Sequence, residues 1–156
     1  MPLFEYPGVY DSDTILKILK IPKTMLVAGG GVIGCEYACM FAALGVEVTL
    51  VEGRDTVLAF LDKEISDALA QAMIKLGVKL TLSSKIDEVV KNDKNFVVKL
   101  DSGENIEVEN ILAATGRTGA TSNLNLKALG LESGSRGNLS VNEHYQTEMS
   151  HVYAVG

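Results

Sequence analysis

The feature that most constrains the fold is a glycine motif near the beginning of the 156-residue chain. Residues 25–28 form a short apolar run of strand length. Gly29, Gly31 and Gly34 follow it in G-x-G-x-x-G spacing, and the next residues have helical periodicity. This order predicts a strand, a tight turn and the start of a helix.

Each glycine of the motif has a physical reason to be there. Gly29 permits a sharp turn, Gly31 lets the backbone approach a pyrophosphate, and Gly34 lets the helix pack close to the strand. The free N–H groups at the helix start, with the positive end of its dipole, then face the phosphates. We therefore assign Gly29, Gly30, Gly31 and Gly34 to a candidate dinucleotide-binding turn.

A second strand that ends in an acidic residue supports this assignment. Gly45 is expected to end the helix, and residues 47–51 have the pattern of a strand. Glu52 comes next, 18 residues after Gly34, where a carboxylate accepts hydrogen bonds from the ribose hydroxyls of a dinucleotide. Two alternatives stay open here: a glycine turn without a ligand, and another ligand of such folds, for example S-adenosylmethionine.

Glu52 also bears on the choice between NAD and NADP. A 2′-phosphate would bring like charges close together, which costs on the order of several kcal/mol at an effective dielectric constant near 20. Arg54, two residues later, is a natural phosphate partner that would offset this cost. The other interpretation of Arg54 is a plain charge on a loop.

Composition places the chain among globular proteins. Apolar residues make up 47% and charged residues 22%, so one domain with its own core is expected. The net charge of −6 argues against a nucleic-acid partner. The longest apolar run, residues 37–44, is shorter than a membrane span, and no signal peptide is visible. No membrane partner is expected, and a cytoplasmic location is the default expectation.

The two cysteines, Cys35 and Cys39, lie four residues apart on the predicted helix. Such a pair has Cβ atoms about 5–6 Å apart, whereas a disulfide needs about 3.5–4.5 Å. We expect both to be small core residues. No metal site is expected, because two thiols without a nearby third ligand fall short of a zinc site.

The lead-in, residues 1–22, precedes the glycine motif. Residues 1–10 are expected to be extended. A short helix is predicted over residues 14–20, with an N-cap at 11–13 and a stop at Pro22. Its expected apolar face consists of Ile15, Leu16 and Leu19.

After Glu52 the pattern predicts a further helix and strand. Asp62 is expected to cap a helix over residues 63–76, which Gly77 ends, and residues 78–82 are expected to form the next strand. The expected buried stripe of this helix consists of Ile65, Leu69, Met73 and Leu76. Alternating strands and helices predict a parallel sheet with helices on both faces.

The second half of the chain has a different pattern. Three short alternating runs predict an antiparallel meander in place of a crossover helix, at residues 86–90, 96–100 and 106–108. Residues 111–115 are expected to form a fourth parallel strand, 124–129 one or two helical turns, and 139–141 and 151–155 two short strands. The predicted fold class is α/β, a Rossmann-like parallel sheet with a three-stranded meander as crossover.

Three segments resemble one known family. They are GGGVIGCEYA from Gly29, the ATGR segment that ends at Arg117, and HVYAVG at residues 151–156. They are similar to motifs of the two-dinucleotide flavoprotein oxidoreductases, also called pyridine nucleotide-disulfide oxidoreductases, in which an NAD(P)-binding domain is inserted within an FAD-binding domain. The resemblance implies that residues 1–156 form a single NAD(P)-binding domain, with 1–22 as linker and short helix, and are a fragment of a larger enzyme.

The resemblance also implies a chemistry. The domain would present the nicotinamide of NAD(P)(H) to FAD for hydride transfer. FAD would be held by the full-length parent only, whose FAD and interface domains are the expected protein partners. The isolated chain is expected to carry no flavin, to contain no catalytic residue and to be inactive.

Further site residues follow from the resemblance alone: Val32, Ile33, Glu36, Gly53, Gly116 and Arg117. Val32 and Ile33 would line the pocket, and Glu36 would lie near the nicotinamide. Gly116 would approach the cofactor from the fourth strand. The alternative for Glu36 is a solvated glutamate that favours the helix dipole, and for Arg117 a surface salt bridge.

Within the family, residues 10–16, 58–69 and 116–119 are most similar to a transhydrogenase branch. Relatives such as lipoamide dehydrogenase usually carry a proline where Gly119 stands, and this favours the transhydrogenase branch. Two alternatives stay open: a lipoamide dehydrogenase-like disulfide reductase domain, and a non-catalytic module that binds NAD(H) and reports redox state.

Overall fold

The computed structural model describes residues 6–155, and the chain divides into two compact units, 1–115 and 116–156. The first five residues of the lead-in and the last residue of the HVYAVG segment lie outside the described part. The elements of the first unit in chain order are β1 (Val9–Tyr10), η2 (Ile15–Lys17), β2 (Thr24–Ala28), α1 (Val32–Ala43), β3 (Glu47–Val51), α2 (Lys63–Leu76), β4 (Lys79–Thr81), β5 (Ile86–Lys91), β6 (Phe96–Leu100), β7 (Asn105–Val108) and β8 (Asn110–Ala113).

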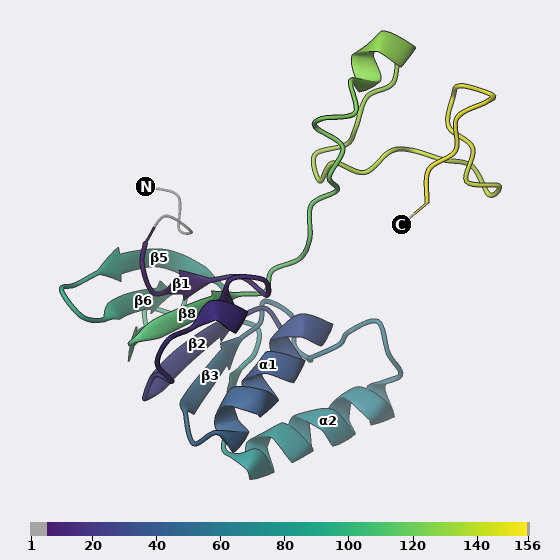
Figure 1. The fold of residues 1–156 in the computed structure, drawn as a ribbon. Coiled ribbons are helices and arrows are strands. Elements are labelled where there is room, and N and C mark those ends of the chain that lie inside the picture. Colours follow the sequence, from purple (N-terminus) through teal and green to yellow (C-terminus); the bar gives the residue numbers. More distant parts are fainter. Residues whose placement is uncertain (1–5, 156) are drawn as a thin grey trace. The chain divides into compact units, whose positions relative to one another are not determined.

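The main sheet is parallel and has five strands in the order β1-β8-β2-β3-β4 (Figure 1). β2 is central, and its last residue, Ala28, pairs with Val51 of β3 and Ala113 of β8. The carboxyl ends of three neighbouring strands therefore align at one edge. Gly29, Glu52 and the residues after β8 leave the sheet together at this edge.

The two faces of the sheet carry different layers. Met25 and Val27 of β2 belong to a core cluster with residues of α1 and α2, whereas Leu26 and Ala28 belong to a second cluster with residues of β6. The expected α/β class, with a parallel sheet and a separate antiparallel meander, is confirmed. The expected placement of helices on both faces is wrong. Helices α1 and α2 pack on the same face of the sheet, and the meander covers the other face (Figure 1).

The topology explains why both helices share a face. The chain steps from β2 to β3 and from β3 to β4 in one direction across the sheet. Crossovers of the usual right-handed kind that step in one direction lie on one face. The opposite face is covered by the antiparallel sheet β5-β6-β7, from which Phe96, Val98 and Leu100 are buried in the second cluster.

The lead-in differs from its expected helix. A three-residue 3-10 helix, η2, replaces the helix over residues 14–20, and Leu16 and Leu19 are 74% and 102% exposed. The Asp11 carboxylate accepts hydrogen bonds from the N–H and hydroxyl of Thr14 (2.8 and 2.6 Å). This is the bonding pattern of the expected N-cap, in which a side-chain oxygen accepts the N–H of the third residue on. The chain nevertheless leaves the helical conformation at Ile18, whose ψ is 127°. Within the expected extended start, Val9 and Tyr10 form a strand that pairs with β8.

Helix α2 has the predicted bounds but a different buried stripe. Gly77 ends it with φ of +100°, a left-handed conformation that favours glycine. Asp62 occupies the N-cap position without a side-chain capping bond. Ile65 is 56% exposed, because Ser66 and Met73 take the buried positions, with Leu69 packed against the same core. Leu76, also expected in the stripe, is 43% exposed. No helix within residues 6–155 is both long and apolar enough to cross a membrane.

The remaining first-unit boundaries are close to those expected. The strand expected over 78–82 is β4, Lys79–Thr81, and the meander strands are confirmed with shifts of one residue at their ends. The fourth parallel strand is β8, Asn110–Ala113. A register shift between Ile86 and Glu88 marks the start of the β5–β6 ladder.

The second unit has few regular elements in its described part. The expected helical turn is η3 (Leu126–Leu129), which Gly130 ends in the left-handed conformation. The strands expected at 139–141 and 151–155 are wrong, since only isolated bridges form, Ser133 with Leu139 and Gln146 with Tyr153. The Asn142 side-chain oxygen accepts hydrogen bonds from two backbone N–H groups nearby, and such turns compete with a ladder.

Gly119 occupies a close approach within the second unit. Its backbone N–H donates to the carbonyl of Arg136 at 2.7 Å. A Cβ atom at this position would lie 2.5 Å from the carbonyl oxygen of Gly137. A proline here would lack the N–H, so the glycine is required by this local conformation.

Candidate dinucleotide-binding site

The glycine turn between β2 and α1 closes tightly at Gly29. Its φ is +108°, and its N–H donates to the carbonyl of Val51 at 2.8 Å. A Cβ atom at Gly29 would lie 2.5 Å from the carbonyl oxygen of Ala114. Both the backbone angle and the space therefore require glycine, as the sequence predicts.

The turn is closed on one side and open on the other. A Cβ atom at Gly34 would overlap the carbonyl oxygen of Gly29, so the first turn of α1 packs directly on the glycine turn. At Gly31 a Cβ atom would meet nothing within 4 Å, although its φ of −78° suits any residue. Gly31 thus leaves the backbone bare beside free space, which fits a diphosphate.

The start of α1 suits an anion. Gly31 is the N-cap and has no side chain that could bond the free N–H groups of the first helical turn. No acidic residue lies in that turn. The positive end of the helix dipole is therefore available for a negatively charged group.

Glu52, directly after β3, is hydrogen-bonded to the glycine turn. One carboxylate oxygen accepts a hydrogen bond from the N–H of Gly30 at 2.6 Å, and the other accepts one from the N–H of Arg54 at 3.0 Å. The residue is half-buried. A carboxylate has about four lone-pair sites, so two acceptor positions are left for ribose hydroxyls.

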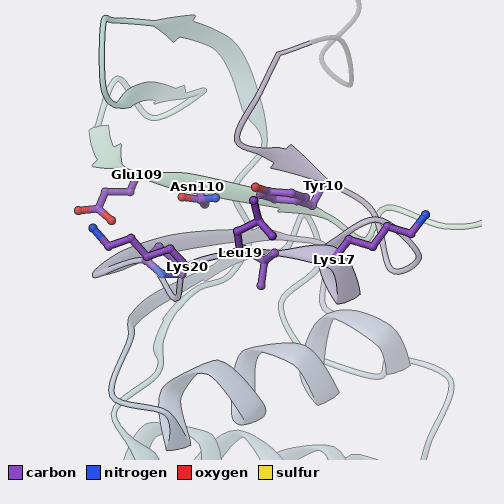
Figure 2. A pocket seen from close by; sticks show the side chains of 8 residues that line it. Tyr10, Lys17, Leu19, Lys20, Glu109 and Asn110 are labelled. Carbon is purple, nitrogen blue, oxygen red and sulfur yellow. The ribbon is translucent and has the colours of Figure 1, made fainter.

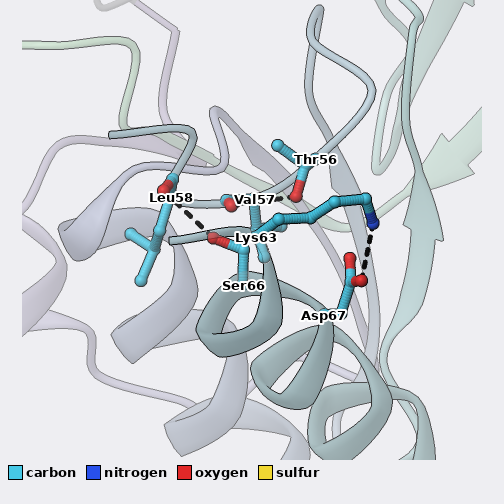
Figure 3. A network of polar contacts seen from close by, with 6 residues as sticks. All are labelled: Thr56, Val57, Leu58, Lys63, Ser66 and Asp67. Atoms are coloured by element: carbon cyan, nitrogen blue, oxygen red, sulfur yellow. Dashed lines mark hydrogen bonds and ion pairs between the residues drawn. The ribbon is translucent and has the colours of Figure 1, made fainter. Parts of the chain in front are cut away.

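The loop after β3 is also fastened to the turn. The carbonyl of Gly30 accepts a hydrogen bond from the N–H of Leu58 at 2.8 Å, and Leu58 has a φ of +45°, which is unusual for a leucine. The buried Ser66 hydroxyl donates to the Leu58 carbonyl at 3.2 Å (Figure 3). The start of α2 therefore helps to hold the loop against Gly30, a role for Leu58 and Ser66 that the sequence did not predict.

Cys35 lies beneath the turn. Its side chain is 4% exposed, and the thiol donates to the Gly30 carbonyl at 3.5 Å. Burial raises the pKa of the Cys35 thiol to about 11, and the neighbouring Cys39, Glu52 and Glu36 act in the same direction. Cys35 is a core residue as predicted, whereas Cys39 is half-buried, and both are free cysteines.

A lysine that the sequence did not assign lies beside Gly53, the residue after Glu52. A Cβ atom placed on Gly53 would lie 3.6 Å from Cγ and 3.8 Å from Cε of Lys85, so the lysine stem lies next to Gly53. The side chain of Arg54 is exposed on the same loop. The sequence gives no local signal for Lys85, because only the pairing of β3 with β4 brings it close.

The other predicted site residues lie on the first turns of α1 and at the start of the second unit. Val32 is 48% exposed and Glu36 is exposed, while Ile33 is half-buried, all on the first turns of α1. Gly116 and Arg117 are exposed and belong to the second unit. Their roles toward a cofactor stay predictions.

A separate cavity of about 400 Å³ lies beside the lead-in (Figure 2). Glu109 and Asn110 line it at the amino end of β8, whereas the glycine turn follows the carboxyl end of β2. Ligands of open parallel sheets bind at carboxyl ends, so this cavity does not belong to the candidate site. Its lining residues are Tyr10, Lys17, Ile18, Leu19, Lys20, Pro22, Glu109 and Asn110.

The parallel sheet, the helices on one face and the meander on the other define the class of protein: an α/β protein with the fold of flavoprotein oxidoreductases. The chain belongs to the pyridine nucleotide-disulphide oxidoreductase family, whose family model matches residues 3–156. The resemblance seen in the sequence is therefore confirmed.

Curated relatives include the soluble pyridine nucleotide transhydrogenases of Aliivibrio fischeri and Serratia proteamaculans. They are 46% and 44% identical to this chain over 153 residues, which is 98% of its length. The chain spans about a third of the length of these relatives, 32% and 33%. Among solved structures, the HOCl-induced flavoprotein disulfide reductase RclA from Escherichia coli is 30% identical with a TM-score of 0.86, covering 99% of this chain and 35% of that one.

Proposed function

We propose that the first unit binds NAD(P)(H) at the glycine turn. The diphosphate lies against the N–H groups at the start of α1, and Glu52 accepts hydrogen bonds from the adenosine ribose. The observation that carries this proposal is the arrangement at Gly30 and Gly31, one contact and one free space. The Glu52 carboxylate holds the Gly30 N–H at 2.6 Å, while the space beside Gly31 is free.

The chain is further proposed to be the NAD(P)-binding part of a larger, FAD-containing oxidoreductase. Support comes from its family and from relatives about three times its length. The bound nicotinamide and the flavin supply hydride exchange, and this chain supplies position and charge. In this arrangement Val32, Ile33 and Glu36 line the nicotinamide half of the site, and the roles of Gly116 and Arg117 are those that the family resemblance implies.

The transhydrogenase reaction is the favoured activity of the whole protein. Identity to proteins named soluble pyridine nucleotide transhydrogenase reaches 46%, compared with 30% to the flavoprotein disulfide reductase. A disulfide reductase is the second candidate, because the solved structures of RclA, which are similar to this chain, carry that name. The word soluble in the names of the relatives supports a cytoplasmic location.

A transhydrogenase must accept both NAD(H) and NADP(H). Glu52 favours NAD(H), since its charge repels a 2′-phosphate by on the order of several kcal/mol at an effective dielectric constant near 20. Arg54 follows on the same loop with an exposed side chain, and its guanidinium offsets that repulsion. The combination of acid and base at one turn permits binding of either dinucleotide.

Titration of the 156-residue chain with NADH, followed by nicotinamide fluorescence, tests the proposal. Saturable binding is expected. Gly31→Glu places a carboxylate where the phosphates bind and is expected to abolish it. Ser102→Glu adds the same charge on an exposed turn of the meander and serves as the matched control. Equal NADH affinity in Gly31→Glu and the unaltered chain would contradict the proposal.

The role of Arg54 is tested in the same titration with NADPH. Arg54→Ala is expected to weaken NADPH by about tenfold, the effect of losing one charge-assisted hydrogen bond, and to leave NADH nearly unchanged. If both affinities stay the same, the arginine is a plain surface charge.

A further inference from the structure

We propose that Lys85 is a specificity-determining residue of the same site, whose ammonium donates to the 2′-phosphate of NADP(H). This inference rests on the proposed dinucleotide function and adds to it a second phosphate-binding cation from another loop. The ligand class is an adenosine that carries a phosphate on its 2′-oxygen.

The loop that carries Lys85 is tied to the loop that carries the acid. The N–H of Ser84 donates to the Glu52 carbonyl at 3.1 Å, and the N–H of Ser83 donates to the Arg54 carbonyl at 2.8 Å. The N–H of Glu52 donates to the carbonyl of Thr81 at 3.0 Å. These bonds continue the β3–β4 pairing past the end of the sheet and join the two loops. We call the joined residues, 52–54 and 81–84, the β3–β4 corner.

The backbone of Lys85 is held from the other side as well. Its N–H donates to the Asp101 carboxylate at 3.0 Å, and its carbonyl accepts a hydrogen bond from the N–H of Asp101 at 2.9 Å. Lys85 is thus fixed between the corner and the turn that follows β6. Its side chain leaves from a defined position.

The aliphatic part of the Lys85 side chain lies beside Gly53, the residue after Glu52. The point where a Cβ atom of Gly53 would lie is 3.6 Å from Cγ and 3.8 Å from Cε of Lys85. A larger residue at position 53 would push the stem away. The ammonium is one bond beyond Cε and therefore lies near the loop that begins at Gly53. Glu52, the residue before this loop, binds the ribose hydroxyls in the proposed function.

The charge of Lys85 is available for a ligand. Lys85 is exposed, and neither it nor Arg54 takes part in any salt bridge found among residues 6–155. The Asp101 carboxylate already accepts the Lys85 N–H, and the acids next along the chain, Asp55 and Asp87, are exposed to solvent. The positive charges of Arg54 and Lys85, on neighbouring loops, then offset the negative charge of the half-buried Glu52.

This arrangement gives a physical account of dual cofactor use. A ribose with a free 2′-hydroxyl needs only Glu52 as hydrogen-bond acceptor. A 2′-phosphate also needs a positive charge nearby, which offsets its repulsion from the Glu52 carboxylate. Arg54 supplies it from the acid's own loop and Lys85 from the adjacent one. Lys85 therefore affects NADPH and leaves NADH almost untouched.

The test is a titration of the 156-residue chain with NADH, NADPH, 5′-AMP and adenosine 2′,5′-bisphosphate, for the unaltered chain, Lys85→Gln and Lys85→Arg. Lys94→Gln removes the same charge in the exposed turn between β5 and β6 and is the control. Lys85→Gln is expected to weaken NADPH and the bisphosphate by about tenfold and NADH and 5′-AMP by less than about twofold. Lys85→Arg is expected to restore most of the loss.

The outcomes separate the two proposals. Suppose that the unaltered chain binds NADH and that Lys85→Gln and the unaltered chain have equal affinity for NADPH. The Lys85 inference is then wrong, and the proposed dinucleotide site stands. Equal weakening of all four ligands also overturns the inference, because it indicates a general effect on the adenosine pocket. If the unaltered chain binds none of the four, the proposed function fails and the inference falls with it.

Discussion

The Glu52 carboxylate accepts a hydrogen bond of 2.6 Å from the backbone N–H of Gly30, which lies 22 residues earlier in the chain. Its other oxygen accepts a hydrogen bond from the N–H of Arg54. One side chain therefore joins the turn after β2 to the turn after β3. In the proposed function, recognition of the ribose and the shape of the glycine turn therefore depend on the same carboxylate.

Glu52→Gln is expected to weaken NADH binding by about tenfold or more. The amide group points an N–H donor at one of two backbone donors, and the hydrogen bonds to a charged acceptor are worth about 1.5–3 kcal/mol. NADPH should lose less, because the repulsion of the 2′-phosphate disappears with the charge. Fluorescence titration of both ligands measures the ratio.

Glu47→Gln is the matched control for this change. Glu47 begins β3 and is exposed, whereas Glu52 follows the other end of the same strand. Its substitution is expected to leave both affinities within about twofold. An unchanged NADH affinity in Glu52→Gln would show that the carboxylate does not contact the ribose.

Gly31→Ala and Gly34→Ala should separate binding from folding. Gly31→Ala has room for its methyl group and a permissive backbone, so the midpoint of urea unfolding should stay the same while NADH affinity falls by about tenfold. Gly34→Ala puts its methyl group on the Gly29 carbonyl and should lower the free energy of unfolding by about 3 kcal/mol or more. Equal stabilities for the two variants would mean that α1 is not packed on the turn.

The sequence predicts the bounds of a helix or strand correctly where neighbouring residues determine them. β3 and α2 have the predicted bounds, because strand alternation, helical periodicity and Gly77 are all encoded in neighbouring residues. The helix expected at residues 14–20 does not form, because Leu16 and Leu19 of its expected apolar face are exposed. A helix this short is stable only when its apolar face is packed, and the periodicity of the sequence does not show whether it is.

The features missed by sequence reasoning depend on pairing across the sheet. β1 forms because Val9 lies opposite Ile111, about a hundred residues away, and two residues carry no periodic signal of their own. Glu52 is predicted as a ribose acceptor, but its bond to Gly30 requires the aligned ends of β2 and β3. Lys85 is brought next to Gly53 by the pairing of β3 with β4 and the loop bonds beyond it.

Two polar contacts on the first turns of α2 should differ in their effect on stability (Figure 3). The exposed Lys63–Asp67 pair is the shorter, at 2.6 Å, and the buried Ser66 bond to Leu58 is 3.2 Å. Asp67→Asn should lower the free energy of unfolding by less than about 0.5 kcal/mol, since solvent screens an exposed i,i+4 pair. Ser66→Ala should lower it by about 1 kcal/mol, because the partly buried carbonyl of Leu58 loses its donor.

Urea unfolding of the two variants measures the difference. Ser66→Ala should also weaken NADH slightly, because Leu58 donates to the carbonyl of Gly30 in the turn. Asp67→Asn should not. A larger loss in Asp67→Asn than in Ser66→Ala would show that burial does not decide the strength of these contacts.

The stability of the first unit should fall at alkaline pH partly through Cys35. In the folded chain burial raises the pKa of this thiol from its ordinary value of 9.0 to about 11, with smaller contributions from Cys39 and the acids Glu52 and Glu36. The unfolded chain therefore loses the thiol proton first as the pH rises. The contribution of Cys35 to stability is complete below about pH 9 and is lost as the pH rises through about 11.

Comparison of the unaltered chain with Cys35→Ala by urea unfolding at about pH 8 and about pH 10.5, in the presence of a reductant, isolates this effect. Lysines and tyrosines titrate in the same range in both proteins, so only the difference between them is informative. That difference should shrink by about 1–2 kcal/mol at the higher pH, because one pKa unit corresponds to about 1.4 kcal/mol. Cys39→Ala, which removes a half-buried thiol, should show a smaller change. A pH-independent difference for Cys35→Ala would mean that the thiol beneath the glycine turn ionises as readily in the folded chain as in the unfolded one.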